Sequence, residues 1–258
     1  MKLCRFRPKE TGKTGHSLYG IIQGGHVLER GGPFELQEKT GQSWLLSDAQ
    51  LLAPCEPSKI VCVGRNYAGH AAELGSALPK EPLIFLKPPS AIIAPEEPVV
   101  LTPHSERVDY EGELAIVIQK NCRNLKASDD VTAYILGYTC LNDVTARDLQ
   151  KKDVQFTRAK GFDTFCPFGP WIETEFDLKS ARLETLVNGK QRQSARITEM
   201  VFPADFLIRW ISQVMTLLPG DVIATGTPSG VGPLNVGDVV EVSISGIGTL
   251  KNPVIASA

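Results

Sequence analysis

The sequence predicts a mainly β protein with a mixed sheet core and a few helices, preceded by a small β-rich N-terminal domain. Three observations favour this fold class. Short apolar segments outnumber helical patterns, and turn residues rather than regular helical crossovers separate them. The clearest amphipathic helix covers residues 202–218 and is stopped by Pro219 and Gly220. Residues 1–54 form shorter alternating segments interrupted by glycine, which is typical of a separate small unit.

Along the chain, alternation first predicts strands at 17–23 and 26–29. Prolines in 53–57 indicate a linker, so we expect an N-terminal domain over 1–55 and a main domain over 56–258. Residues 65–75 are polar and could form a short helix, and Asn188-Gly189 predicts a hairpin turn. Strands of the main domain are expected at 59–64, 82–87, 108–118, 134–141, 168–173, 221–225 and 238–244.

Composition indicates an ordinary globular protein, with 42% hydrophobic and 22% charged residues in 258. A net charge of -2 gives no electrostatic footprint for nucleic acid or for a membrane surface. We find neither a secretory signal nor an apolar stretch near the roughly 20 residues of a spanning helix. Six scattered cysteines predict reduced, buried thiols in a cytoplasmic protein. Cys166 lies near Lys160 and could be reactive, although packing is the favoured role.

Two carboxylates on one predicted strand give the first indication of function. Glu111 and Glu113 fall within the strand 108–118, where alternation puts both on one face and Gly112 on the other. Two like charges on a buried face repel each other and lose hydration, which a divalent cation relieves. Oxygen ligands favour Mg²⁺, Mn²⁺ or Ca²⁺ over a thiolate zinc site. A solvated edge strand is the alternative for this pair taken alone.

Asp143 is the expected third oxygen ligand. It follows a predicted strand and opens a predicted helix, with Asn142 or Asp143 as the N-cap. Asp143, Arg147 and Gln150 would then lie on one helix face. In a simpler alternative, Asp143 only caps the helix and pairs with Arg147. Three carboxylates around one divalent ion would leave positions for water and a chelating substrate.

Three further features fit an anionic substrate. Lys87 ends an apolar strand and Lys160 lies downstream of the carboxylates, so both could hold a negative charge, although most lysines are simply solvated. The Gly-rich loop 226–232 could bind an anion through its backbone N–H groups. His70 and Glu73 would be neighbours on a helical turn. The carboxylate would orient the imidazole as a general base for water, unless the pair is an ordinary surface contact.

Taken in order, these segments resemble the fumarylacetoacetate hydrolase family, and in particular its small members that act on acylpyruvates, oxaloacetate or related α-keto diacids. The resemblance extends over residues 58–255 and implies a twisted mixed sheet rolled into a barrel-like shape, usually in a homodimer. The matching motifs are Gly64-Arg65-Asn66-Tyr67, Phe85-Leu86-Lys87-Pro88, Asp109-Tyr110-Glu111-Gly112-Glu113, Asn142-Asp143-Val144-Thr145-Ala146-Arg147-Asp148, Lys160-Gly161-Phe162-Asp163 and Thr225-Gly226-Thr227-Pro228-Ser229-Gly230-Val231-Gly232.

The resemblance also implies a role for each matching residue. Mg²⁺ or Mn²⁺ would be the cofactor, and Ca²⁺ could take its place in crystals. The implied metal ligands are Glu111, Glu113 and Asp143. The implied catalytic residues are His70 and Glu73, which prepare a water molecule, and Lys160, which lies beside the metal. The expected substrate-binding residues are Arg65, Lys87, Arg147, Gln150 and Thr227.

The favoured function is divalent-metal-dependent cleavage of a C–C bond in a small acylpyruvate-type 2,4-dioxo acid, through a metal-stabilised enolate. Two other outcomes at the same site stay open. One is decarboxylation or keto–enol tautomerisation of oxaloacetate, and the other is isomerisation of 2-hydroxyhepta-2,4-diene-1,7-dioate. A catalytically idle protein that binds a keto acid or a partner protein is the alternative from another class. The presence of all three carboxylates and of Lys160 disfavours it.

Overall fold

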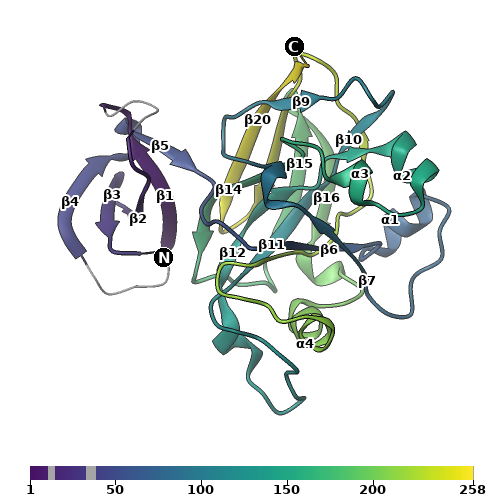
Figure 1. Cartoon of the computed structure of the whole chain (residues 1–258), viewed down its shortest axis with the longest axis horizontal. Helices are drawn as coiled ribbons and strands as arrows, with labels where there is room; N and C mark the ends of the chain where they lie inside the picture. The colour runs from purple at the N-terminus through teal and green to yellow at the C-terminus, as the bar shows by residue number, and fades with distance from the viewer. Residues whose placement is uncertain (11–14, 33–38, 258) are drawn as a thin grey trace.

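A computed structural model describes residues 1–10, 15–32 and 39–257, and it has a small β lobe beside a larger β body (Figure 1). The small lobe is an antiparallel sheet in the order β4-β3-β2-β1, with β5 also paired to β1. Its strands are β1 Lys2–Pro8, β2 Leu18–Gln23, β3 His26–Arg30, β4 Lys39–Leu45 and β5 Ala49–Leu52. Phe6 and Val27 form its core. β1 also pairs with β14, which joins the lobe to the main sheet.

The main sheet continues through the larger body in the order β14-β12-β11-β17-β6-β7. The strands are β6 Ile60–Gly64, β7 Leu83–Lys87, β8 Ile92–Ile93, β11 Gly112–Ile118, β12 Ile135–Asn142, β14 Cys166–Glu173 and β17 Val222–Ala224, with β8 beside β14. Within this order β17 and β6 run parallel and the other neighbours run antiparallel. Its pairing stays open at β4 and β7 among the described residues, so the expected roll is not a closed barrel.

Two smaller sheets complete the larger body, and the five-stranded one packs against the main sheet. A three-stranded sheet has the order β13-β10-β18, and a five-stranded sheet has the order β16-β15-β19-β20-β9. Their strands are β9 Val99–Leu101, β10 Val108–Tyr110, β13 Thr145–Ala146, β15 Arg182–Val187, β16 Lys190–Arg196, β18 Gly232–Pro233, β19 Val239–Ile244 and β20 Gly248–Ala256. The hairpin predicted at Asn188-Gly189 is confirmed, because both residues have positive φ and connect β15 to β16.

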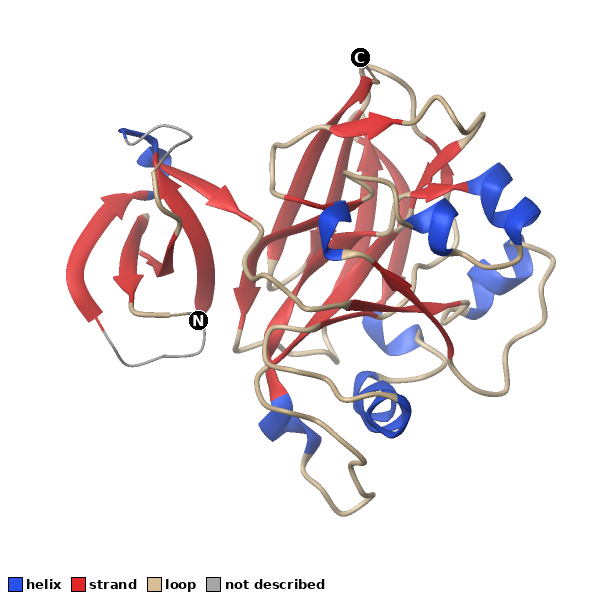
Figure 2. Ribbon diagram, in the orientation of Figure 1, coloured by secondary structure: helices blue, strands red, loops and turns tan. Residues whose placement is uncertain are grey.

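Helices are few, and three of them gather on one side of the larger body (Figure 2). The α-helices are α1 Ala68–Glu73, α2 Arg147–Asp153, α3 Thr157–Lys160 and α4 Ala204–Val214. Short 3₁₀ turns cover Leu46–Asp48, Pro89–Ala91, Val131–Tyr134 and Ile197–Glu199. α4 buries Leu207 and Ile211 in the largest core cluster. It ends earlier than predicted, because the backbone of Leu217 exchanges two hydrogen bonds with Cys122 in an extended conformation.

Two chain segments leave the main sheet at the same point, which corrects two predictions. The expected strand 108–118 is broken at Glu111 into β10 and β11, which belong to different sheets. The helix expected from Asn142 or Asp143 starts only at Arg147, and neither residue caps it, because the chain first forms β13 with β10. The breaks face each other, since the Asp143 N–H donates to the Glu111 carbonyl at 2.8 Å.

The state of the cysteines fits another expectation. All six cysteines are free and buried, as predicted. Burial raises the pKa of the Cys166 thiol to about 12, which supports packing rather than reactivity at that position. No helix among the described residues is long and apolar enough to cross a membrane.

Candidate active site and metal centre

The three predicted metal ligands come together where the two strands change sheet. Glu111, Glu113 and Asp143 are buried, and one carboxylate oxygen from each lies within 4.8 Å of the other two. Gly112 faces the opposite side, as predicted. A Cβ on it would lie 2.1 Å from Thr185 Oγ1. The donor set is all carboxylate oxygen, which fits a hard divalent ion.

Buried cations neutralise two of the three carboxylates. Lys160 Nζ donates to Glu111 Oε2 at 2.7 Å and to Asp143 Oδ2 at 2.6 Å. Arg147 Nη2 donates to the other oxygen of Glu111. Glu113 differs, because its hydrogen-bond donor is the Gly226 N–H at 2.7 Å and no cation of the described chain forms an ion pair with it. Glu113 is therefore the carboxylate without a counter-charge.

The ion pairs of the described residues leave out the same carboxylate. Of the four buried carboxylates here, Asp109 pairs with Arg147 and with the partly exposed Arg107, and Glu111 and Asp143 have the partners given above. Burial, with the charges of Asp143 and Glu111, raises the pKa of Glu113 well above its ordinary value. Burial would also raise the pKa of Glu111, but Lys160 and Arg147 outweigh it and leave that pKa lowered. A divalent cation would supply the missing positive charge at Glu113.

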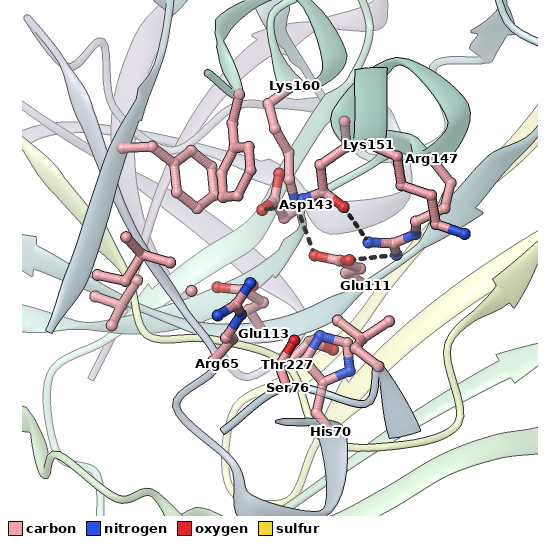
Figure 3. A pocket seen from close by; sticks show the side chains of 17 residues that line it. Arg65, His70, Ser76, Glu111, Glu113, Asp143, Arg147, Lys151, Lys160 and Thr227 are labelled. Atoms are coloured by element: carbon pink, nitrogen blue, oxygen red, sulfur yellow. Dashed lines mark hydrogen bonds and ion pairs between the residues drawn. The ribbon is translucent and has the colours of Figure 1, made fainter. Parts of the chain in front are cut away.

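The carboxylates line a cavity of about 200 Å³, to which α1 contributes His70 and α2 contributes Arg147, Gln150 and Lys151 (Figure 3). This is smaller than the ~300–1,000 Å³ of pockets for drug-sized ligands, so it fits a small metabolite. Arg65 and Lys151 line the cavity, and neither makes an ion pair within the described chain. The other lining residues are Val63, Gly64, His70, Leu74, Ser76, Leu83, Phe85, Glu111, Glu113, Asp143, Arg147, Gln150, Phe156, Lys160 and Thr227.

His70 lies across the cavity from Glu111 (Figure 3). Glu73 is its neighbour on the same helix, α1. His70 Nδ1 is 3.4 Å from Glu73 Oε2. Glu73 is held in turn by the Gly230 N–H at 3.1 Å. The predicted pair is therefore formed, and its carboxylate can orient the imidazole as a general base.

The Gly-rich loop binds anions as predicted, but the anions are the protein's own carboxylates. Its Gly226 N–H donates to Glu113, and its Gly230 N–H donates to Glu73. Gly226 has φ +100, and a Cβ there would lie 2.7 Å from Asn66, so this position requires glycine. The loop therefore holds one residue of the metal centre and one of the His–Glu pair.

The comparison with family models now identifies the chain. The model described as fumarylacetoacetate (FAA) hydrolase C-terminal matches residues 59–255. The chain belongs to the fumarylacetoacetate hydrolase family. A second model, described as Rv2993c-like, N-terminal, matches residues 1–54.

Several family relatives resemble the chain over most of its length. Protein Rv2993c of Mycobacterium tuberculosis is 54% identical over 226 residues, which are 86% of this chain and 85% of the relative. The mitochondrial oxaloacetate tautomerase FAHD2A of Bos taurus is 43% identical over 222 residues, 81% of this chain and 70% of the relative. The crystal structure of 5-carboxymethyl-2-hydroxymuconate delta-isomerase from Mycobacterium smegmatis has a TM-score of 0.91 at 46% identity, with both chains fully covered.

Most residues with an expected substrate role line the cavity, and Lys87 is the exception. Arg65, Gln150 and Thr227 do so as expected. The Lys87 side chain lies behind Asp143 instead, and its Nζ donates to Asp143 Oδ1 at 2.7 Å and to the Val144 carbonyl. Lys87 is thus a counter-ion of the predicted metal ligand Asp143. It is the buried last residue of β7, and its side chain reaches the Asp143 carboxylate.

Arg147 reaches the cavity but is largely committed to the protein. Its Nε donates to Asp109 Oδ2 at 2.9 Å, its Nη1 to Gln150 Oε1 at 2.7 Å and its Nη2 to Glu111. The alternative in which Arg147 pairs with Asp143 is therefore wrong. Asp109 was missed as its partner, because the pairing depends on β10 and β13 lying side by side.

Sequence reasoning also missed part of the cavity wall. Lys151 follows Gln150 and lies one helical turn after Arg147, so helical spacing could have found it. Phe85 lies in a matched motif and packs edge-on against Phe156 at 5.4 Å between ring centroids. Ser76 carried no signal, because only the tertiary fold brings the segment after α1 to the cavity.

The raised pKa of Glu113 predicts a specific dependence of stability on pH. In the metal-free protein the folded state holds this proton more tightly than the unfolded chain. The free energy of unfolding should therefore fall as the pH rises above the ordinary Glu value of about 4.5. Glu113→Gln should remove this dependence. At pH 8 it should raise the free energy of unfolding of the metal-free protein by about 1–2 kcal/mol, and with it the melting temperature.

Thermal melts with EDTA or with Mg²⁺ check this prediction. Mg²⁺ should stabilise the wild type at pH 8 and fail to stabilise Glu113→Gln, because the amide lacks the negative charge that binds the ion. The matched control is Glu81→Gln, an exposed glutamate outside the cavity. Equal stabilisation of wild type and Glu113→Gln by Mg²⁺ would contradict the assignment of Glu113.

Proposed function

We propose that this enzyme uses Mg²⁺ or Mn²⁺ to form the enolate of a small 2-oxo dicarboxylic acid, with His70 as the group that moves a proton. One observation carries the proposal. His70, oriented by Glu73, faces the carboxylate triad across a cavity of about 200 Å³. A base on one wall and an electrophilic centre on the other are what proton transfer next to a carbonyl group requires.

The charge of each residue at the centre determines its proposed role. A divalent ion held by Glu111, Glu113 and Asp143 would stabilise the negative charge that develops on the substrate. Burial would lower the pKa of Lys160, but Asp143 and Glu111 outweigh it and the pKa is raised. Lys160 Nζ also donates to both carboxylates at 2.7 and 2.6 Å, so we assign it the role of a fixed positive charge. This leaves His70 as the proton-transfer group of the cavity.

Keto–enol tautomerisation is the outcome that we place first. His70 would take a proton from the carbon beside the keto group, and a proton returned to the enolate oxygen would complete the reaction without breaking a C–C bond. The likeness to an oxaloacetate tautomerase at 43% identity and to a delta-isomerase at 46% identity supports proton transfer of this kind.

Hydrolytic cleavage of an acylpyruvate, which the sequence favours, is the second candidate. The His70–Glu73 pair supports it, because a base with its own orienting carboxylate can equally deprotonate water. The hydroxide would attack the distal carbonyl, and the C–C bond would break to give pyruvate enolate and a carboxylic acid. Decarboxylation of oxaloacetate needs no base, so it leaves the pair without a role.

Two cavity cations that make no ion pair with any described residue support a dicarboxylate as the substrate. Arg65 comes from the segment between β6 and α1, and Lys151 comes from α2, so they approach the cavity from different elements. Arg65 has φ +57, a conformation that is uncommon outside glycine and recurs at binding sites. Each cation would bind one carboxylate.

The homodimer implied by the resemblance stays a prediction, which analytical ultracentrifugation would test.

Product analysis tests the reaction type. We expect EDTA-sensitive interconversion of the enol and keto forms of oxaloacetate, followed by ultraviolet absorbance. His70→Ala should slow it by at least about 100-fold, because a general base contributes 10²–10⁴-fold. His26→Ala, in the N-terminal lobe, is the control. Acetate plus pyruvate from acetylpyruvate would support the second candidate. Release of CO₂ from oxaloacetate with full activity in His70→Ala would contradict both.

Charge removal at Lys151 tests the substrate class. Lys151→Gln should raise KM for oxaloacetate by about tenfold, the effect of losing about 1.4 kcal/mol of charge-assisted binding. Exchange of the methyl protons of pyruvate, followed by NMR in D₂O, should change little, because pyruvate lacks the second carboxylate. Lys152→Gln is the matched control, since Lys152 is exposed and outside the cavity. An equal effect of both variants would contradict a role for Lys151.

A further inference from the structure

We propose that Gln193, on the edge strand β16 outside the cavity, is a positioning residue that ties the metal ligands to the Gly-rich loop. The proposal rests on the metal centre of the proposed function and extends it to the five-stranded sheet. It predicts that one uncharged side chain controls both the affinity for the metal and the rate of proton transfer.

The amide of Gln193 bridges two segments that carry the site. Gln193 is only 1% exposed, although most of its neighbours on β16 are exposed. Its Oε1 accepts from the Gly112 N–H at 3.0 Å. Its Nε2 donates to Thr227 Oγ1 and to the Pro228 carbonyl, both at 2.8 Å. Both N–H groups of the amide and its oxygen are thus in use, so the side chain has one orientation.

The partners of this amide lie next to the chemistry on both sides. Gly112 stands between Glu111 and Glu113, and its carbonyl accepts from Thr227 Oγ1 at 2.8 Å. Thr227 and Pro228 belong to the loop whose N–H groups hold Glu113 and Glu73. A displacement of the loop would therefore move a metal ligand and the carboxylate that orients His70 at the same time.

The hairpin β15–β16 is packed against these segments without space for side chains. A Cβ on Gly112 would lie 2.1 Å from Thr185 Oγ1, and a Cβ on Gly230 would lie 2.1 Å from the Arg192 carbonyl. Neither position has space for a Cβ, so both residues must be glycine. The hairpin thus serves as a rigid backing, and Gln193 is the side chain that connects it to both segments.

Removing the amide should affect function through position and not through direct contact. Gln193→Met keeps the length and the volume of the side chain, but it leaves the Gly112 N–H and the Pro228 carbonyl without partners in a buried site. The segment 111–113 and the loop 226–230 would then lose their common constraint. We expect weaker metal binding and slower proton transfer together.

Isothermal titration with Mn²⁺, beside steady-state kinetics, tests the proposal. Gln193→Met should weaken Mn²⁺ binding by at least about tenfold and lower kcat more than it changes KM. Gln191→Met is the matched control. Gln191 is on the same strand and also donates a side-chain hydrogen bond, to Glu184 at 2.7 Å, but it is exposed and away from the site. The control should change neither quantity.

A second variant keeps the test decisive if Gln193→Met does not fold. Thr227→Val removes the hydroxyl that Gln193 contacts, and it should also weaken Mn²⁺ binding. Where both variants fold, the double variant should lose less affinity than the sum of the two single losses, since both act on one bridge. Unchanged Mn²⁺ affinity in these variants, with only a lower melting temperature, would overturn the inference. A wild type that binds no Mn²⁺ would overturn the proposed function with it.

Discussion

The structure depends on one constraint, which is the burial of a carboxylate that has no ion-pair partner among the described residues, at the point where two strands change sheet. Glu111 and Asp143 lie at facing breaks in their strands, and the backbone hydrogen bond between them fixes both breaks. Unpaired buried charge costs several kcal/mol, so the fold must surround these carboxylates with cations. Lys160, Arg147 and Lys87 do this for two carboxylates and leave Glu113 uncompensated. The deficit at Glu113 supports our proposal of a metal site in place of a closed ion-pair network.

The other half of the site follows from the same loop that holds Glu113. The Gly226 N–H donates to Glu113 and the Gly230 N–H donates to Glu73, so one loop holds the proposed metal ligand and the partner of the proposed base His70. The cavity beside this loop is small, and it is lined by Arg65 and Lys151, which make no ion pair among the described residues. A small dianion would fit the size and the charge of this space. The choice between proton transfer and hydrolysis then depends on what His70 contacts, carbon or water.

The sequence predicted those parts of the site that depend on local pattern. Alternation along one strand placed Glu111 and Glu113 on one side, and helical spacing placed Glu73 next to His70. What failed depends on pairing between distant segments. The break at Glu111 and the late start of α2 follow from the pairing of β10 with β13, which no local pattern encodes. For the same reason the partners of Arg147 and the place of Lys87 behind Asp143 were missed.

Anomalous diffraction from a crystal soaked in Mn²⁺ would test the central claim most directly. We predict one strong anomalous peak bounded by Glu111, Glu113 and Asp143, at about 2.1 Å from an oxygen of each carboxylate. The Lys160 ammonium should remain beside it without entering its coordination shell. A saturated crystal without a peak at these carboxylates, or with Mn²⁺ only at surface sites, would show that the buried charge deficit serves another purpose.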